Sequence, residues 1–347
     1  MLNQAPPKSP KSRNELDQAR KAVEDLFPPR AAIFWSDLLI SAALGWSAFA
    51  LACIAESLSV KMVVATVVAA IALYRALMFV HELSHLRADA PRGFTEVWNL
   101  IVGIPCLFPS FLYVGVHADH HKLSTYGTAQ DPEYMPFAGA RVAIMGFLAQ
   151  SLLLPAIFSV RFLVLAPLGI LFPPLHRFLE RRVSALSMNP AYYRKVSDQV
   201  RRHIIVTELV ILGIWAIPIS LAAAGILPWR VFLIWYGVVG CISFINALRT
   251  LAAHRYRNDG ERMDRTTQLL DSIDTPGRPW TVLWAPVGLR YHALHHYFPS
   301  IPYHNLPLAH QRLIQALPTE SPYCQTTSPS LWHSLRTLWR NDKTIKN

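Results

Sequence analysis

Four long apolar stretches dominate the pattern of the chain, at about residues 33–53, 60–80, 204–226 and 231–253. Each approaches the roughly 20 residues that a helix needs to cross a bilayer. Backbone groups in lipid must satisfy their hydrogen bonds within the segment, so such stretches are expected to be helices. The pattern therefore predicts an all-α integral membrane protein with about four transmembrane helices.

Two further apolar stretches, residues 97–114 and 142–172, are less suited to crossing. The first is short and interrupted by two prolines. The second contains Arg161 and two prolines, and it is too long for one comfortable span and too short for two. We interpret both as in-plane or re-entrant helices buried against protein, with a six-span arrangement as the alternative.

Composition supports a membrane protein of one domain. Hydrophobic residues make up 52% of the 347 residues and charged residues only 16%, whereas about 25% is usual in soluble chains. Residues 1–31 form a polar N-terminal tail without the pattern of a cleavable signal peptide. Residues 32–313 are predicted to form the membrane domain, with its histidines in a cytoplasmic cap, and residues 314–347 a C-terminal tail.

The net charge of +11 is concentrated where a topology signal is expected. Seven of the basic residues fall between positions 177 and 202, and basic loops beside spans mark the cytoplasmic side. We therefore predict no nucleic-acid partner and a protein of a bacterial inner membrane whose site faces the cytoplasm. The four cysteines form no C-x-x-C pair and are expected to pack as small apolar side chains.

Histidines carry the clearest chemical signal. Two lie in His81-Glu-Leu-Ser-His85, while two later segments repeat the pattern H-x-x-H-H, and His254 follows the last apolar stretch. On a helix, residues three and four apart share a face, so each group can aim at one point. The predicted topology places all of them on one side of the membrane. Imidazole is a common ligand of iron, copper, zinc and nickel, so this ligand type leaves the metal open. The candidate ligands are His81, His85, His117, His120, His121, His254, His292, His295 and His296.

These groups resemble the three histidine boxes of the integral-membrane fatty acid desaturase family. The resemblance covers about residues 33–313 and is most specific at residues 81–85, 117–132 and 291–304. It implies a non-haem centre of two iron ions, bound by the nine histidines, that uses O2 to desaturate a lipid acyl chain. It also implies a separate electron donor, such as a ferredoxin or a cytochrome b5-like protein.

Several polar residues are candidates for supporting the histidines. Some relatives place an asparagine one turn before the histidine that corresponds to His254; here Thr250 stands there and Asn246 lies two turns back, and either could support a water ligand. Carboxylates commonly hold the second nitrogen of a metal-binding imidazole. The candidates for that role are Glu82, Asp119, Asp131 and Glu133. Aromatic residues within 108–113 and 231–236 are candidates for lining an apolar substrate slot.

Alternative functions remain open at this point. Desaturation and hydroxylation or ketolation of a lipid-like substrate both begin with hydrogen abstraction, and the resemblance favours desaturation. His81-Glu82-Leu83-Ser84-His85 also matches H-E-x-x-H, the pattern of a zinc metalloprotease with Glu82 as general base, but that function leaves two histidine boxes unexplained. A transporter would place ionisable groups near the middle of its spans, where this chain has few.

Overall fold

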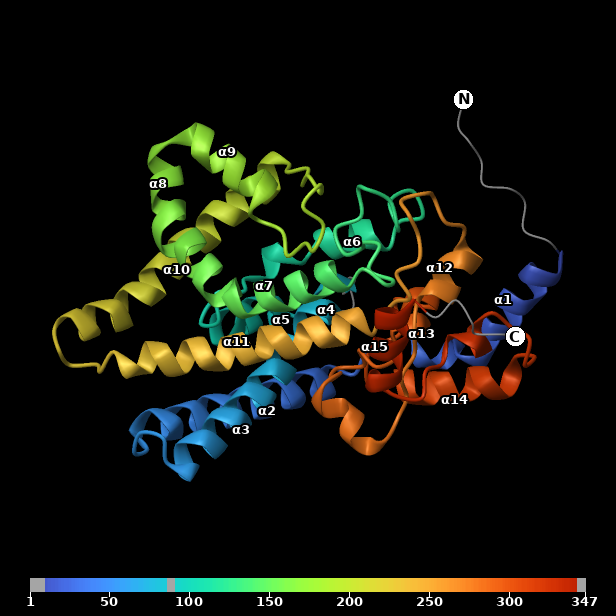
Figure 1. Cartoon of the computed structure of the whole chain (residues 1–347), viewed down its shortest axis with the longest axis horizontal. Coiled ribbons are helices and arrows are strands. Elements are labelled where there is room, and N and C mark those ends of the chain that lie inside the picture. The colour runs from blue at the N-terminus through green and yellow to red at the C-terminus, as the bar shows by residue number, and fades with distance from the viewer. Residues whose placement is uncertain (1–9, 86–90, 342–347) are drawn as a thin grey trace.

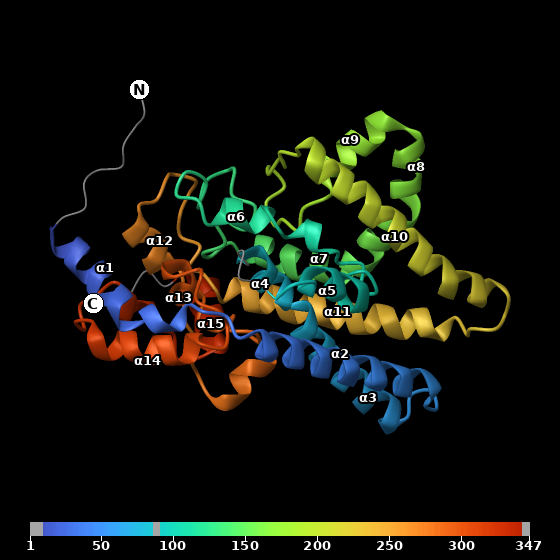
Figure 2. The same ribbon diagram turned by 180° about the vertical axis from the view of Figure 1, so that it is seen from behind.

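The computed structural model describes residues 10–85 and 91–341, and within these ranges the regular elements are helices (Figure 1). The predicted all-α class is confirmed. The long helices α2, α3, α10 and α11 extend together toward one end of the molecule. Helices α1 and α12 to α15 gather at the other end, and the view from behind shows the same arrangement (Figure 2).

Four of the long helices match the predicted spans. They are α2 (Ala31–Ile54), α3 (Val60–Leu77) continued by α4 (Phe79–His85), α10 (Asp198–Ala223) and α11 (Arg230–Leu251). Helices α2 and α3 pack along each other as a hairpin, and α11 lies against both. Each is long and apolar enough to cross a bilayer.

A fifth helical segment also meets this criterion, which differs from our interpretation of residues 142–172. Helix α7 (Arg141–Ser159) runs through a π-helical turn (Val160–Leu165) into α8 (Ala166–Leu171), giving 31 continuous residues. Pro155 lies inside α7 without ending it. Proline removes one helical hydrogen bond, but neighbouring backbone adjustments such as a π turn can accommodate it in an apolar helix. By length and composition, residues 141–171 therefore form a further candidate span.

The other interrupted stretch, residues 97–114, forms short helical pieces and is mostly buried. It contains α5 (Phe94–Trp98), a π-helical turn (Asn99–Gly103) and a 3₁₀ turn (Ser110–Leu112), and it is not one of the candidate spans of the described residues. The Asn99 side chain accepts a hydrogen bond from the Ser110 backbone at 2.8 Å and donates one to its hydroxyl. These two hydrogen bonds satisfy buried polar groups within an apolar core, as burial requires.

The cap is built from helices at both ends of the chain. It contains α1 (Pro10–Ala22), α12 (Arg265–Asp271), α13 (His292–Tyr297), α14 (Leu306–Ala316) and α15 (Leu331–Arg340). Ala19 of α1 and Leu313 of α14 are fully buried in one apolar cluster, and Leu338 of α15 is buried in another. The two predicted tails thus contribute α1 and α15 to this cap.

A buried ionic network joins the π-helical turn at Val160–Leu165, α9 (Pro173–Arg182) and α10. Arg161 is 1% exposed and Glu208 0%, and their side chains meet at 2.5 Å. The second Glu208 oxygen lies 3.2 Å from His176 Nε2, and Arg161 also donates to the Ser184 hydroxyl at 2.8 Å. Each charge depends on its partner, because an ion left unpaired in this interior carries an uncompensated desolvation cost.

We predict that Glu208→Gln lowers stability by about 3–5 kcal/mol, because the Arg161 charge loses its carboxylate. The thermal unfolding midpoint in detergent measures this effect. Asp198→Asn is the control, since its side chain is 90% exposed and surface ion pairs contribute little. Equal midpoints for the two variants would show that the buried pair does not stabilise the fold.

Candidate metal centre

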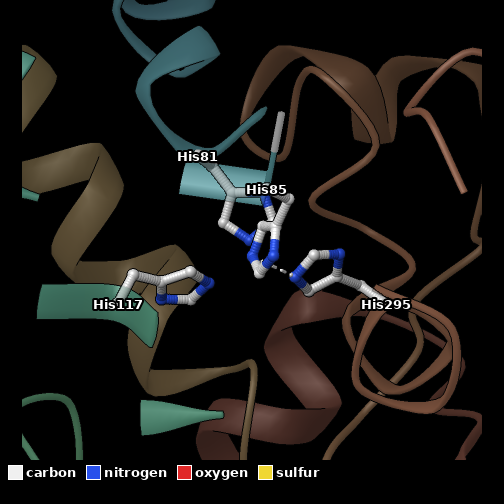
Figure 3. A group of neighbouring side chains, drawn as sticks. All are labelled: His81, His85, His117 and His295. Atoms are coloured by element: carbon white, nitrogen blue, oxygen red, sulfur yellow. Dashed lines mark hydrogen bonds between the residues drawn. The ribbon is translucent and has the colours of Figure 1, made fainter. Parts of the chain in front are cut away.

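The first group of histidines comes from three elements that are distant in sequence. His81 and His85 lie four residues apart on α4, His117 lies on α6 (Val116–His120) and His295 on α13. Their rings converge on one region (Figure 3). One nitrogen from each of the four lies within 4.8 Å of the others. The rings of His81 and His85 lie 4.2 and 4.3 Å from that of His295, centroid to centroid.

The second group combines His120, His254, His292 and His296, whose ligand nitrogens also lie within 4.8 Å of one another. His292 and His296 share a face of α13, whereas His254 follows the end of α11. The Nε2 atoms of His254 and His292 are 2.8 Å apart, and those of His292 and His296 are 3.1 Å apart. Helices α6 and α13 thus contribute to both groups.

His121 lies between the two groups. Its Nε2 atom is 3.0 Å from that of His117 and 3.2 Å from that of His295. Its ring also stacks on His296, with centroids 4.2 Å apart. The structure therefore brings all nine predicted histidines together, in two groups of four with His121 between them.

This arrangement fits two transition-metal ions. Two nitrogens bound in neighbouring positions at about 2.1 Å from one ion lie about 3 Å apart, which is the separation found here. The described buried nitrogens without a hydrogen-bond partner include His120 Nε2 and both ring nitrogens of His81. Buried polar atoms normally have a partner, so these nitrogens have an unused capacity that a bound cation would satisfy.

Acidic and phenolic groups hold the opposite nitrogens of three imidazoles. His117 Nδ1 donates to Glu133 at 2.7 Å, and His120 Nδ1 donates to Asp131 at 2.9 Å. A hydrogen bond at Nδ1 fixes the tautomer in which Nε2 is free to bind a metal. The Asp131 and Glu133 contacts agree with the sequence-based expectation.

The third contact was not foreseen. His254 Nδ1 lies 2.9 Å from the Tyr126 hydroxyl, which donates to Asp271 at 2.9 Å. Asp271 also accepts a hydrogen bond from Tyr134, at 3.1 Å. Asp271 belongs to no motif, and only the fold of α12 brings it beside His254.

The other expected supporting residues lie elsewhere. Asp119 forms an ion pair with Lys122 and accepts a hydrogen bond from Tyr192 at 2.8 Å, so its contacts are not with an imidazole. Glu82 lies 3.9 Å from His81 Nδ1, beyond hydrogen-bonding distance, and accepts the backbone N–H of Tyr303 at 3.1 Å. The expectations for Asp119 and Glu82 are therefore not met.

Asn246 accepts a hydrogen bond from Arg249 at 2.9 Å, and the Thr250 carbonyl accepts one from Tyr256. A water ligand supported by Asn246 or Thr250 stays a prediction.

Burial sets the charge state of most of the site. It lowers the pKa of five imidazoles well below the usual value, which keeps them neutral and able to bind a cation. These are His117, His121, His292, His295 and His296. For His120, burial is again the largest effect and lowers the pKa, but the carboxylates of Asp131, Glu133 and Asp271 together outweigh it, so the pKa is raised. Burial also raises the pKa of Glu133 to about 7.

An apolar cavity of about 110 Å³ reaches this centre. Part of its wall is formed by Leu77, Phe108, Leu154 and Ile242. The wall also includes Tyr113 and Glu133, and both of these residues contact His117. Of the aromatic residues within 108–113, Phe108 and Tyr113 line this cavity. Residues 231–236 do not line this cavity.

The sequence comparisons agree with this geometry. A model of the fatty acid desaturase family matches residues 57–328, a range that includes all nine histidines. The chain belongs to the fatty acid desaturase family. A ceramide hydroxylase of Caulobacter vibrioides (strain NA1000 / CB15N) is 41% identical over 326 residues, which cover 93% of this chain and 92% of that protein.

Family membership confirms the resemblance seen in the sequence and identifies the protein as an oxygen-dependent oxidoreductase. Members of this desaturase and hydroxylase family generally use a di-iron centre, in agreement with the two histidine groups. The zinc-protease alternative loses its support, because His81 and His85 join His117 and His295 in one group and the chain belongs to the desaturase family.

We predict that Asp131→Asn weakens metal binding about 10- to 100-fold, because His120 loses the carboxylate that orients it. Metal content of the purified protein, measured against chelator concentration, tests this. Asp119→Asn is a matched control on the same segment, since the Asp119 carboxylate contacts Lys122 and Tyr192 instead. Metal loss of the same size in both variants would contradict the assigned role of Asp131.

Proposed function

We propose that this protein is a membrane lipid hydroxylase that acts on a sphingolipid-like substrate. The observation that carries the proposal is the 41% identity to a ceramide hydroxylase, because it extends over nearly the whole of both chains. The expectation of fatty acyl desaturation rested on histidine boxes that both reactions share. The relative therefore favours hydroxylation within the same family.

We further propose that the two histidine groups bind two iron ions. His81, His85, His117, His121 and His295 surround one position, and His120, His254, His292 and His296 surround the other. When bound, the iron pair would supply the O2-dependent oxidising chemistry that an unactivated C–H bond requires.

The chain's own contribution is positioning and the exclusion of water. The cavity wall holds an acyl chain in an apolar environment, which fixes the reacting carbon in place. Glu133 accepts hydrogen bonds from His117 and Tyr113 at the inner end of the cavity, which keeps that imidazole aligned. In the overall reaction, one oxygen atom of O2 enters the C–H bond. The other leaves as water after an external donor supplies two electrons and protons are taken up.

The basic surface around residues 177–202 is suited to binding a separate electron carrier. Arg177, Arg181, Arg182, Lys195 and Arg202 are exposed there. Arg194 is buried and donates to backbone carbonyls, so it belongs to the fold and not to this surface. The same loop packs on the histidine-bearing segment, since Asn189 donates to the Asp131 carbonyl at 2.9 Å. An acidic carrier bound at this surface would lie close to the proposed iron site.

Desaturation is the second candidate function, and the family description favours it. Mass spectrometry of lipids from bacterial cells with and without the protein separates the two functions. We predict ceramides that gain one oxygen atom, with no new species in cells that express His296→Ala. Lipids that lose two hydrogen atoms, without added oxygen, would instead identify a desaturase.

We predict that the basic loop faces the cytoplasm of a bacterial inner membrane. Gln199→Cys, in a background with the four natural cysteines replaced by serine, places one thiol at an exposed position in the first turn of α10, within this basic segment. A membrane-impermeant thiol reagent should label it only after the cells are opened. Labelling in intact spheroplasts would contradict this orientation.

A further inference from the structure

A buried guanidinium at the cavity is the strongest unexplained polar feature near the proposed metal centre. Arg249 lies in the last turn of α11, is only 8% exposed and lines the cavity. Glu133 lines the same cavity and contacts His117, so Arg249 shares this cavity with a residue that touches the proposed metal centre.

The hydrogen bonds of Arg249 are incomplete. A guanidinium carries five N–H donors and stays charged in proteins. One terminal nitrogen donates to Asn246 at 2.9 Å, and the group also contacts the Tyr74 hydroxyl. Nε is buried without a partner, and Arg249 forms no ion pair with the described carboxylates. A buried charge is costly unless it is paired and hydrogen-bonded.

The surroundings of Arg249 make this position stand out from the rest of the cavity. Much of the wall is apolar, as a hydrocarbon chain requires. The face of α11 beside the guanidinium adds Ser243, Asn246 and Thr250. These positions are spaced three and four residues apart, so they lie on one side of the helix. The cavity thus has an apolar wall over much of its surface and a polar patch on α11 around Arg249.

We propose that Arg249 binds an acceptor oxygen of the lipid's polar part, and so holds a carbon close to that oxygen at the metal centre. This inference rests on the proposed function and makes it more specific. A lipid with an amide and hydroxyl groups provides such oxygens, and a carboxylate would provide the same chemistry. A substrate oxidised far along a plain hydrocarbon chain would leave the guanidinium without its acceptor.

Binding gives a test that does not depend on turnover. Anything that binds the folded state alone raises the unfolding midpoint. In mixed micelles, a ceramide should raise the midpoint of the wild-type protein, and Arg249→Met should abolish most of this rise while retaining the wild-type metal content. Arg141→Met makes the same chemical change at an exposed position outside the cavity and should keep the full rise.

Turnover provides a second readout. Loss of a hydrogen bond to a charged group should lower kcat/KM for the ceramide about 10- to 100-fold in Arg249→Met. Arg249→Lys keeps the charge without the forked donors and should lie between wild type and Arg249→Met. It also keeps the test available if the methionine variant does not fold. An unchanged ceramide-induced rise and unchanged kcat/KM in these variants would overturn the proposal.

Two further lipids identify the oxygen and separate this inference from the proposed function. A 3-deoxy ceramide that is equally sensitive to Arg249→Met would assign the amide oxygen, whereas loss of that sensitivity would assign the hydroxyl. A rise with a free fatty acid alone, abolished by Arg249→Met, would support the role of Arg249 and reject the sphingolipid substrate. Ceramide hydroxylation that is equal in wild type and Arg249→Met would support the sphingolipid substrate and reject the role of Arg249.

Discussion

The structure depends on bringing neutral imidazoles from four separate parts of the chain to two neighbouring points beside an apolar cavity. Such a cluster is unfavourable unless something compensates for it, because the nitrogens face one another at about 3 Å in a buried environment. Neutral imidazoles repel one another less than imidazolium ions would. Burial keeps these imidazoles neutral because it disfavours the charged form. A cation bound at each point would pair with these buried nitrogens and offset the remaining free-energy cost of placing them together. The fold and metal binding are therefore expected to stabilise each other.

The helices position the ligands through their periodicity. On α6, His117 faces the first point and His120 the second, and the residues of α13 divide in the same way, with His295 on one side and His296 on the other. His121 follows α6 directly and contacts His117 and His295. The short spacing H-x-x-H-H thus serves two ions at once. Asp131 and Glu133 follow closely in sequence and hold His120 and His117 from behind.

Much of this arrangement could be predicted from the sequence. The apolar stretches gave four spans, because length and hydropathy depend on local composition. The histidine spacing predicted the ligand groups, because a helical face is a local property. The predictions that failed depended on the tertiary structure. Asp271 reaches His254 only through the fold of a segment without a motif. Asp119 lies beside two histidines in sequence but points toward Lys122 and Tyr192. The prolines in residues 142–172 suggested a break, whereas the helix continues through a π-helical turn.

Metal stoichiometry combined with location tests the central claim most directly. Anomalous X-ray scattering at the iron edge, from crystals of the purified protein, locates each ion relative to the histidines. The account predicts two iron positions, one among His81, His85, His117, His121 and His295, and one among His120, His254, His292 and His296. A single metal position, or an ion bound outside these two groups, would contradict it.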